Sequence, residues 1–127
     1  MPVIARWTDD TQTIQHIHFS GDWSLDELYA VMQEAREMAA TINHPYIVLA
    51  DLTNSPNLPA RILSTGNYAV SNPYPPAMVI VIGSGRFLEV TLDMYHNLYP
   101  QALPNLTMCA TVGEAYRAAR SALADYV

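Results

Sequence analysis

Two runs of β-prone residues without a polar side chain constrain this fold more than any other feature of the sequence. Residues 46–50 form the first run, which ends at Asp51, and residues 77–82 form the second, which ends at Gly83. A strand with one face in water alternates polar and apolar residues, so a strand with no polar face is covered on both sides. Such strands are typical of parallel sheets between layers of helices. The chain is therefore expected to be an α/β protein.

The N-terminal segment has a different pattern. Residues 3–8 and 13–20 each alternate between two faces, and the polar turn between them contains Asp9 and Asp10. Two alternating runs with a short polar connection predict an antiparallel hairpin.

Helices are expected between the strands. Ser24 and Glu27 have the spacing of a capping box, and an apolar stripe follows until residue 42. Further helical patterns cover residues 57–71 and 86–99, and Thr111 with Glu114 forms a second capping box after a short strand at residues 106–110. The expected order is β-β-α-β-α-β-α-β-α. It predicts one domain, residues 1–127, with a mixed sheet, an N-terminal antiparallel hairpin and later parallel strands flanked by helices.

The charged residues exclude several classes of function. The chain has 12 acidic residues against 6 arginines, a net charge of −6, and no basic cluster. Nucleic acid and an anionic membrane surface are therefore not expected as partners. The chain contains no lysine, which excludes Schiff-base chemistry, a pyridoxal phosphate anchor and the phosphate-binding lysine of a Walker loop.

The cellular location is expected to be cytoplasmic. Cys109 is the single cysteine and cannot form an internal disulfide, so it is interpreted as a small buried apolar residue. The N-terminus lacks the pattern of a signal peptide, and no apolar run reaches the roughly 18 residues that span a bilayer.

The order of elements and four short segments together resemble the STAS domain family, which includes bacterial anti-sigma-factor antagonists. The segments are residues 19–24, 48–53, 81–83 and 111–115. The resemblance implies a STAS-like fold and a regulatory, non-enzymatic module that binds a protein partner and forms a homodimer. A branch grouped with lipid-binding Sec14-type domains is similar too, and it implies a small apolar ligand. The family's phosphorylated serine motif is missing, because Ser64 has no preceding aspartate and lies mid-helix.

Ligands of open α/β sheets bind beyond the carboxyl ends of parallel strands. Polar residues follow two such ends, and they form a candidate edge for a ligand or partner. These residues are Asp51, Thr53, Asn54, Ser55, Ser84, Gly85 and Arg86. The loop before Arg86 is able to present backbone amides to an anion. The alternative is that its glycines only make a tight turn, with Ser84 as the helix cap.

The expected helix at residues 86–99 carries large apolar side chains on more than one face. A candidate dimer or pocket surface consists of Phe87, Leu88, Val90, Met94 and Tyr95. Three interpretations stay open: ordinary core, a homodimer surface, or a pocket for a small apolar ligand.

Catalytic and metal-binding patterns are weak. His16 and His18 lie on one face of a strand, a spacing that suits two metal ligands, but no carboxylate or cysteine completes a site locally. They are interpreted as polar residues on the wet face of the hairpin, with no metal and no cofactor expected.

No nucleophile motif is visible, so no enzyme is expected. The leading hypothesis is a non-enzymatic interaction module; the alternatives are a carrier or sensor of an apolar ligand and an enzyme at the Asp51 and Ser84 edge.

Overall fold

The sheet is mixed, and its strands follow one another in space in the order in which they occur in the sequence. The computed structural model describes residues 2–55 and 57–125 of the chain. Within that part the five strands are β1 (Val3–Trp7), β2 (Ile14–Ser20), β3 (Ile47–Asn54), β4 (Met78–Ile82) and β5 (Thr107–Cys109). β1 pairs with β2 in antiparallel fashion, and the pairs β2–β3, β3–β4 and β4–β5 are parallel. The predicted mixed sheet with an N-terminal hairpin is confirmed.

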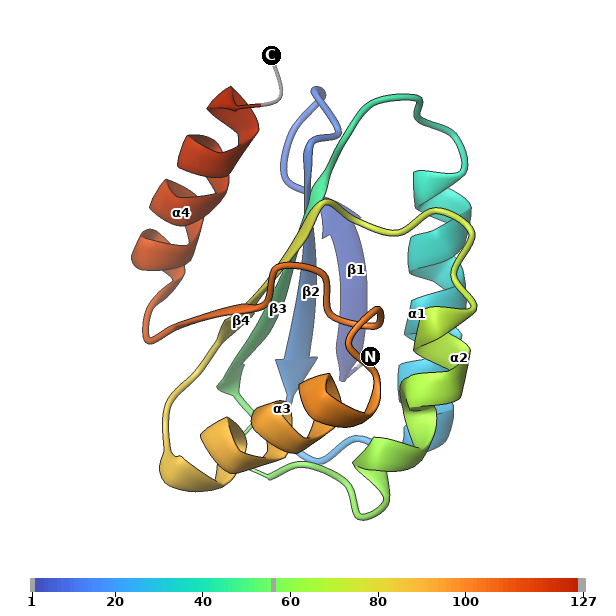
Figure 1. Cartoon of the computed structure of the whole chain (residues 1–127), viewed down its shortest axis with the longest axis vertical. Coiled ribbons are helices and arrows are strands. Elements are labelled where there is room, and N and C mark those ends of the chain that lie inside the picture. Colours follow the sequence, from blue (N-terminus) through green and yellow to red (C-terminus); the bar gives the residue numbers. More distant parts are fainter. Residues whose placement is uncertain (1, 56, 126–127) are drawn as a thin grey trace.

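Helices cover both faces of this sheet (Figure 1). The described residues form the helices α1 (Leu25–Ala39), α2 (Gly66–Val70), α3 (Arg86–Leu98) and α4 (Val112–Ala124), with a 3₁₀ helix η1 (Ile62–Thr65) directly before α2. α1 and α2 lie on one side of the sheet, α4 lies on the other, and α3 crosses below its lower end. The predicted order of elements is confirmed. None of the helices in the described part of the chain has the length and apolar content that a bilayer crossing requires.

The core has two layers, one on each face of the sheet. The layer under α1 contains Val3, Ala5, Ile17, Phe19, Trp23, Leu28 and Val31. The layer under α4 contains Ile14, Ile47, Leu49, Ile80, Ile82, Ala115 and Ala119. Successive strand residues point to opposite faces, so each central strand supplies both layers. The inference that the apolar runs are covered on both sides is confirmed.

The second predicted helix is much shorter than the expected 57–71. Arg61, directly before η1, has a φ of 67°, in the left-handed region, so the helix does not extend backwards through it. Gly66, where α2 begins, lies against the ring of Tyr99, and a Cβ atom there would be 2.0 Å from a ring carbon. Only glycine allows this close approach of α2 to the segment after α3. Ser64 lies exposed in η1.

The two predicted capping boxes differ in outcome. The box of α1 is complete, because Ser24 Oγ accepts from the Glu27 amide at 3.2 Å and Glu27 Oε1 accepts from the Ser24 amide at 3.1 Å. At α4, Thr111 Oγ1 accepts from the Glu114 amide at 3.2 Å. The Glu114 carboxylate accepts from the Thr111 hydroxyl instead of the backbone amide, so only half of that box is present.

Replacing Ser24 by alanine should lower the free energy of unfolding by about 0.5–2 kcal/mol, because the amide of Glu27 loses its acceptor. Urea unfolding monitored by circular dichroism measures the change. Ser84→Ala is the matched control, since Ser84 is exposed in a loop and should leave the midpoint unchanged. Equal midpoints for the two variants would contradict a stabilising role for the α1 cap.

Candidate functional site

A cavity of about 220 Å³ lies between the sheet and the helices α1, α2 and α3. Its floor consists of side chains on β2, β3 and β4: Ile17, Phe19, Val48, Ala50, Leu52, Val79 and Val81. Leu28, Met32 and Ala35 of α1 form one wall, Leu88, Leu92 and Tyr95 of α3 form another, and Ala102 and Leu103 close a third side. The cavity exists because α2 has only 5 residues and α3 crosses below the sheet (Figure 1), so the middle of the sheet is not covered by a full helix.

Most of the cavity wall is apolar, and several of its polar side chains, including the Arg36 guanidinium, are hydrogen-bonded within the protein. Thr65 and Tyr95 hydroxyls lie 2.7 Å apart, and Thr65 Oγ1 also donates to the Ile62 carbonyl. Gln15 Nε2 donates to the Ala35 carbonyl at 3.2 Å. Burial raises the pKa of the Tyr95 phenol, so it stays neutral at physiological pH. The walls therefore favour a ligand that is largely apolar.

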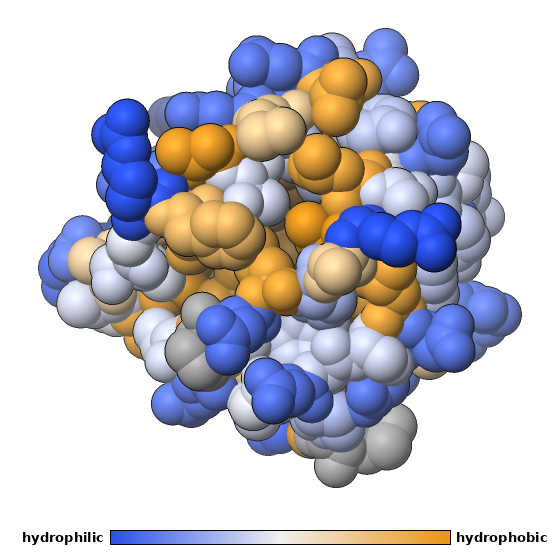
Figure 2. All heavy atoms as spheres, turned by 90° about the horizontal axis from the view of Figure 1, so that it is seen from below, coloured by the Kyte–Doolittle hydropathy of each residue, from blue (hydrophilic) through white to orange (hydrophobic). Residues whose placement is uncertain are grey.

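The five residues of the predicted α3 surface separate into two groups. Leu88 and Tyr95 line the cavity, whereas Phe87, Val90 and Met94 are exposed to solvent, with Phe87 69% exposed. Leu98, which the sequence analysis did not single out, is exposed beside them. Figure 2 shows the molecule from the end where α3 lies, and apolar side chains gather there around a hollow. α3 thus contributes to a pocket wall and to an apolar outer surface at once.

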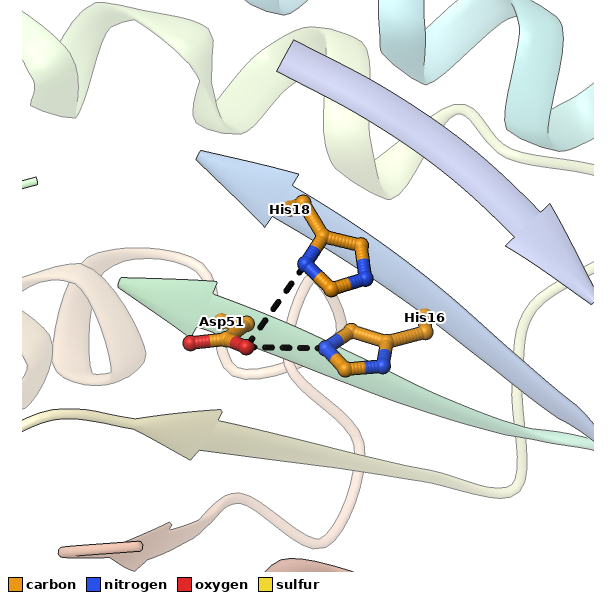
Figure 3. A group of neighbouring side chains, drawn as sticks. All are labelled: His16, His18 and Asp51. Atoms are coloured by element: carbon orange, nitrogen blue, oxygen red, sulfur yellow. Dashed lines mark hydrogen bonds and ion pairs between the residues drawn. The ribbon is translucent and has the colours of Figure 1, made fainter. Parts of the chain in front are cut away.

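The opposite face of the sheet holds a second candidate site, a cluster of His16, His18 and Asp51 (Figure 3). His16 Nε2 lies 3.0 Å from Asp51 Oδ2, and His18 Nδ1 lies 3.8 Å from the same oxygen. The two imidazole rings are stacked, with centroids 3.7 Å apart. Asp51 on β3 is the register partner of His18 on β2, so the parallel pairing of these strands assembles the cluster.

The interpretation of both histidines as residues on a wet face is wrong for His16. Its side chain is 7% exposed, while that of His18 is 39% exposed. The expectation that no carboxylate accompanies them held only for the local sequence, since Asp51 lies 35 residues after His16. The signal that was present in the sequence is the position of Asp51 at the end of a buried run. The register of β2 against β3 was the missing information.

Hydrogen bonds hold the cluster from both sides. Asp51 Oδ1 accepts from the amide of Thr53 at 3.1 Å and from its hydroxyl at 2.6 Å. On the other side, His16 Nδ1 lies 3.1 Å from the hydroxyl of Tyr116 on α4. These hydrogen bonds use Asp51 Oδ1 and His16 Nδ1. The other two atoms, Asp51 Oδ2 and His16 Nε2, therefore stay directed at the centre of the cluster.

The same contacts set the protonation of the cluster. Burial alone would raise the pKa of Asp51, but the hydrogen bonds from Thr53 and the neighbouring His16 outweigh it and lower the pKa below its usual value. Burial lowers the pKa of His18, His16 adds to this effect, and Asp51 opposes it. At neutral pH Asp51 is therefore an anion and His18 is a neutral imidazole.

The polar edge predicted from the sequence is divided among three places. Asp51 and Thr53 belong to the cluster, whereas Ser55 is buried and accepts a hydrogen bond from Trp23 Nε1 at 2.7 Å. Asn54 is exposed at the end of β3, as are Ser84, Gly85 and Arg86 where α3 begins. Across residues 2–55 and 57–125, no hydrogen bond or ion pair joins these last three residues to Asp51.

The loop before α3 also differs from its expected capping. Gly85 is the residue that caps the helix, with a φ of 112° that favours glycine, and no side chain caps α3. The prediction that Ser84 is the cap is therefore wrong, and an anion site at this loop stays a prediction.

Cys109 is only partly buried in β5, and burial raises the pKa of its thiol.

Comparisons with protein-family models, with curated proteins and with solved structures gave no match to this chain. The resemblance to the STAS family therefore stays a prediction.

The wall residue Tyr46 gives a prediction on pH dependence. Its side chain is 5% exposed, its hydroxyl donates to the Tyr74 carbonyl, and burial raises its pKa to about 12. The unfolded state ionises near pH 10, so between about pH 10 and 12 the unfolded chain binds fewer protons and stability falls as pH rises. Tyr46→Phe should cost about 1 kcal/mol at pH 7 through the lost hydrogen bond and make this alkaline fall less steep.

Urea unfolding at a series of pH values measures both effects of Tyr46→Phe. Tyr74→Phe is the control, because the Tyr74 side chain is 46% exposed and it is the Tyr74 backbone that accepts the bond. If the free energy of unfolding of Tyr46→Phe falls with rising pH as steeply as that of the wild type, the alkaline fall does not come from the raised pKa of Tyr46.

Proposed function

We propose that the chain binds a small apolar or amphipathic ligand in the cavity between the sheet and the helices α1, α2 and α3. The observation that carries the proposal is the volume left unfilled within an otherwise packed α/β fold. The space of about 220 Å³ is partly open to solvent and its lining is mostly apolar. A ligand that fills it would bury apolar surface of its own together with that of the wall.

The lining defines the chemical class of this ligand. An enclosed apolar cavity of roughly 150 Å³ accepts benzene, so a space of about 220 Å³ suits a somewhat larger ring or a short alkyl chain. The paired hydroxyls of Thr65 and Tyr95 offer one polar position in the wall, and the Arg36 guanidinium, which donates to the Tyr68 carbonyl, is a second polar group of the lining. A single hydroxyl on the ligand would donate a hydrogen bond to this pair, because the protons of both hydroxyls are already donated within the protein. The rest of the molecule would contact aliphatic side chains.

The STAS-like scaffold is part of this proposal. The order of elements and the segments at residues 19–24, 48–53, 81–83 and 111–115 support it, and the branch grouped with lipid-binding domains implies a ligand of the same class. The proposal requires no reaction, so the protein would act as a carrier or sensor rather than as an enzyme.

A series of linear primary alcohols from butanol to dodecanol tests the cavity directly by isothermal titration calorimetry. Each added methylene should improve the affinity about fourfold, because burying it contributes about 0.8 kcal/mol. The gain should stop at the chain length that fills the cavity. An affinity that rises without a limit would indicate adsorption on an apolar surface, and no binding along the series would refute the proposal.

Ala50→Leu provides the matched variant for this series. Ala50 lies on the cavity floor, paired with Ile17 on one side and Val81 on the other, so a larger side chain there occupies ligand space. The variant should shorten the optimal alcohol and weaken its binding at least tenfold, with no loss of stability. Ala124→Leu, at an exposed position of α4, is the control and should bind as the wild type does. Identical binding by all three proteins would place the alcohols outside the cavity.

We also propose that the exposed surface of α3 carries self-association, the interaction that the STAS resemblance implies. Its large side chains recur along one helix as Phe87, Val90, Met94 and Leu98, and they are between 42% and 69% exposed. Spacings of three and four residues place them on one side of the helix. A second copy of the chain would cover each stripe with an identical one in a two-fold arrangement.

Sedimentation equilibrium measures this association. The wild type should form dimers, and the variant Phe87→Ser with Met94→Ser should be monomeric, because its stripe loses two of its four apolar side chains, including the most exposed one. Glu89→Ser with Asp93→Ser changes exposed polar residues of the same helix and should leave the dimer intact. A wild type that is monomeric at high concentration would rule out a dimer through α3.

A further inference from the structure

We infer that His16, His18 and Asp51 form a binding site for a divalent transition-metal ion of the Zn²⁺ type. The three residues offer two imidazole nitrogens and one carboxylate oxygen, all within 4.8 Å of one another. Zn²⁺ and its first-row neighbours bind this set of ligands, whereas Mg²⁺ and Ca²⁺ prefer sites made of oxygen alone.

The distances between the ligand atoms fit one shared ion. An ion about 2.0–2.2 Å from each ligand in tetrahedral or octahedral geometry places neighbouring ligand atoms about 3–3.5 Å apart. The observed pairs are 3.0 Å for His16 Nε2 to Asp51 Oδ2 and 3.8 Å for His18 Nδ1 to the same oxygen. His18 has to turn slightly out of its stack on His16. Its side chain is 39% exposed, so solvent gives it room.

Each of the two buried ligands is oriented through the atom that does not face the ion. The Tyr116 hydroxyl contacts His16 Nδ1, and Thr53 donates twice to Asp51 Oδ1. When His16 Nε2 binds an ion, the ring proton resides on Nδ1, and the Tyr116 hydroxyl accepts a hydrogen bond from it. Such partners fix the ring orientation of histidine ligands in metal sites. Metal ions bind the neutral form of histidine and the anionic form of aspartate, so metal binding at this site would release any proton that these ligands carry.

The outer side of the cluster is open. Ile4 and Arg6 of β1 are the register partners of His18 and His16, and directly opposed side chains of an antiparallel pair share a face. Both are exposed, so this part of the face lies open to solvent. With three protein ligands, the ion keeps a position for water or a small anion. The charge of Arg6 acts on His18 and favours the anion.

This inference is independent of the proposed cavity ligand. His16 and His18 flank Ile17 in β2, and Ile17 faces the cavity, so the cluster and the cavity lie on opposite faces of the sheet. Either site can fail experimentally while the other remains.

Calorimetric titration of the untagged full chain with Zn²⁺ and with Mg²⁺, after removal of metal by a chelator, tests the inference. We expect one Zn²⁺ per chain, no saturable Mg²⁺ binding, and a higher melting temperature with Zn²⁺. His18→Ala should weaken Zn²⁺ binding at least a hundredfold, and Tyr116→Phe should weaken it about tenfold. His44→Ala removes an exposed histidine of a loop and is the matched control.

Three results would overturn the site: no stoichiometric Zn²⁺ binding, equal binding of Mg²⁺, or an equal loss in His44→Ala and His18→Ala. His18 is partly exposed, so its variant should fold, and circular dichroism verifies this. Asp51→Asn gives a second test, because it keeps the shape of the side chain and removes its charge. If Asp51→Asn does not fold, the comparison of His18→Ala with His44→Ala decides alone.

Discussion

The burial of β3 and β4 on both faces is the constraint on which the rest of this structure depends. Leu49 and Ile80 on the α4 side are 0% exposed, and Val79 and Val81 on the opposite side are 6% and 3% exposed. Alternation along the strands then sends neighbouring residues to environments of opposite chemistry. Ala50 faces the apolar cavity, while Asp51, the next residue, faces two histidines. One short segment of backbone therefore positions both candidate sites, and a slip of one residue would exchange their side chains.

The placement of α3 explains why one face of the sheet is hollow. A helix of this length could cover β4, but α3 begins after the Gly85 turn and crosses below the strands (Figure 1). The segment that follows α3 returns over the sheet and supplies Ala102 and Leu103 to the cavity wall. Contact between Tyr99 and Gly66 fixes this segment against α2. The same placement leaves the outer side of α3 exposed, which is why the cavity and the apolar stripe occur together.

Local signals in the sequence were sufficient for the order of elements and insufficient for the sites. The α1 start was predictable because Ser24 and Glu27 lie three residues apart and act within one turn. The pairing of His16 with Asp51 was not predictable, because it depends on the register of parallel strands that are joined through α1. The cavity depends on a helix that stops early: Arg61 in the left-handed region and Gly66 against Tyr99 shorten α2. Such features arise from tertiary packing and have no local pattern.

The face of the sheet under α1, α2 and α3 retains an apolar cavity in the folded protein. A crystal structure of the ligand-free protein under xenon pressure tests this cavity most directly, because xenon enters apolar cavities without needing a polar partner. Xenon density is expected between Val81 on β4 and Tyr95 on α3, with both side chains in place. A structure in which α3 and the segment after it have moved inward, filling the space and excluding xenon, would contradict it.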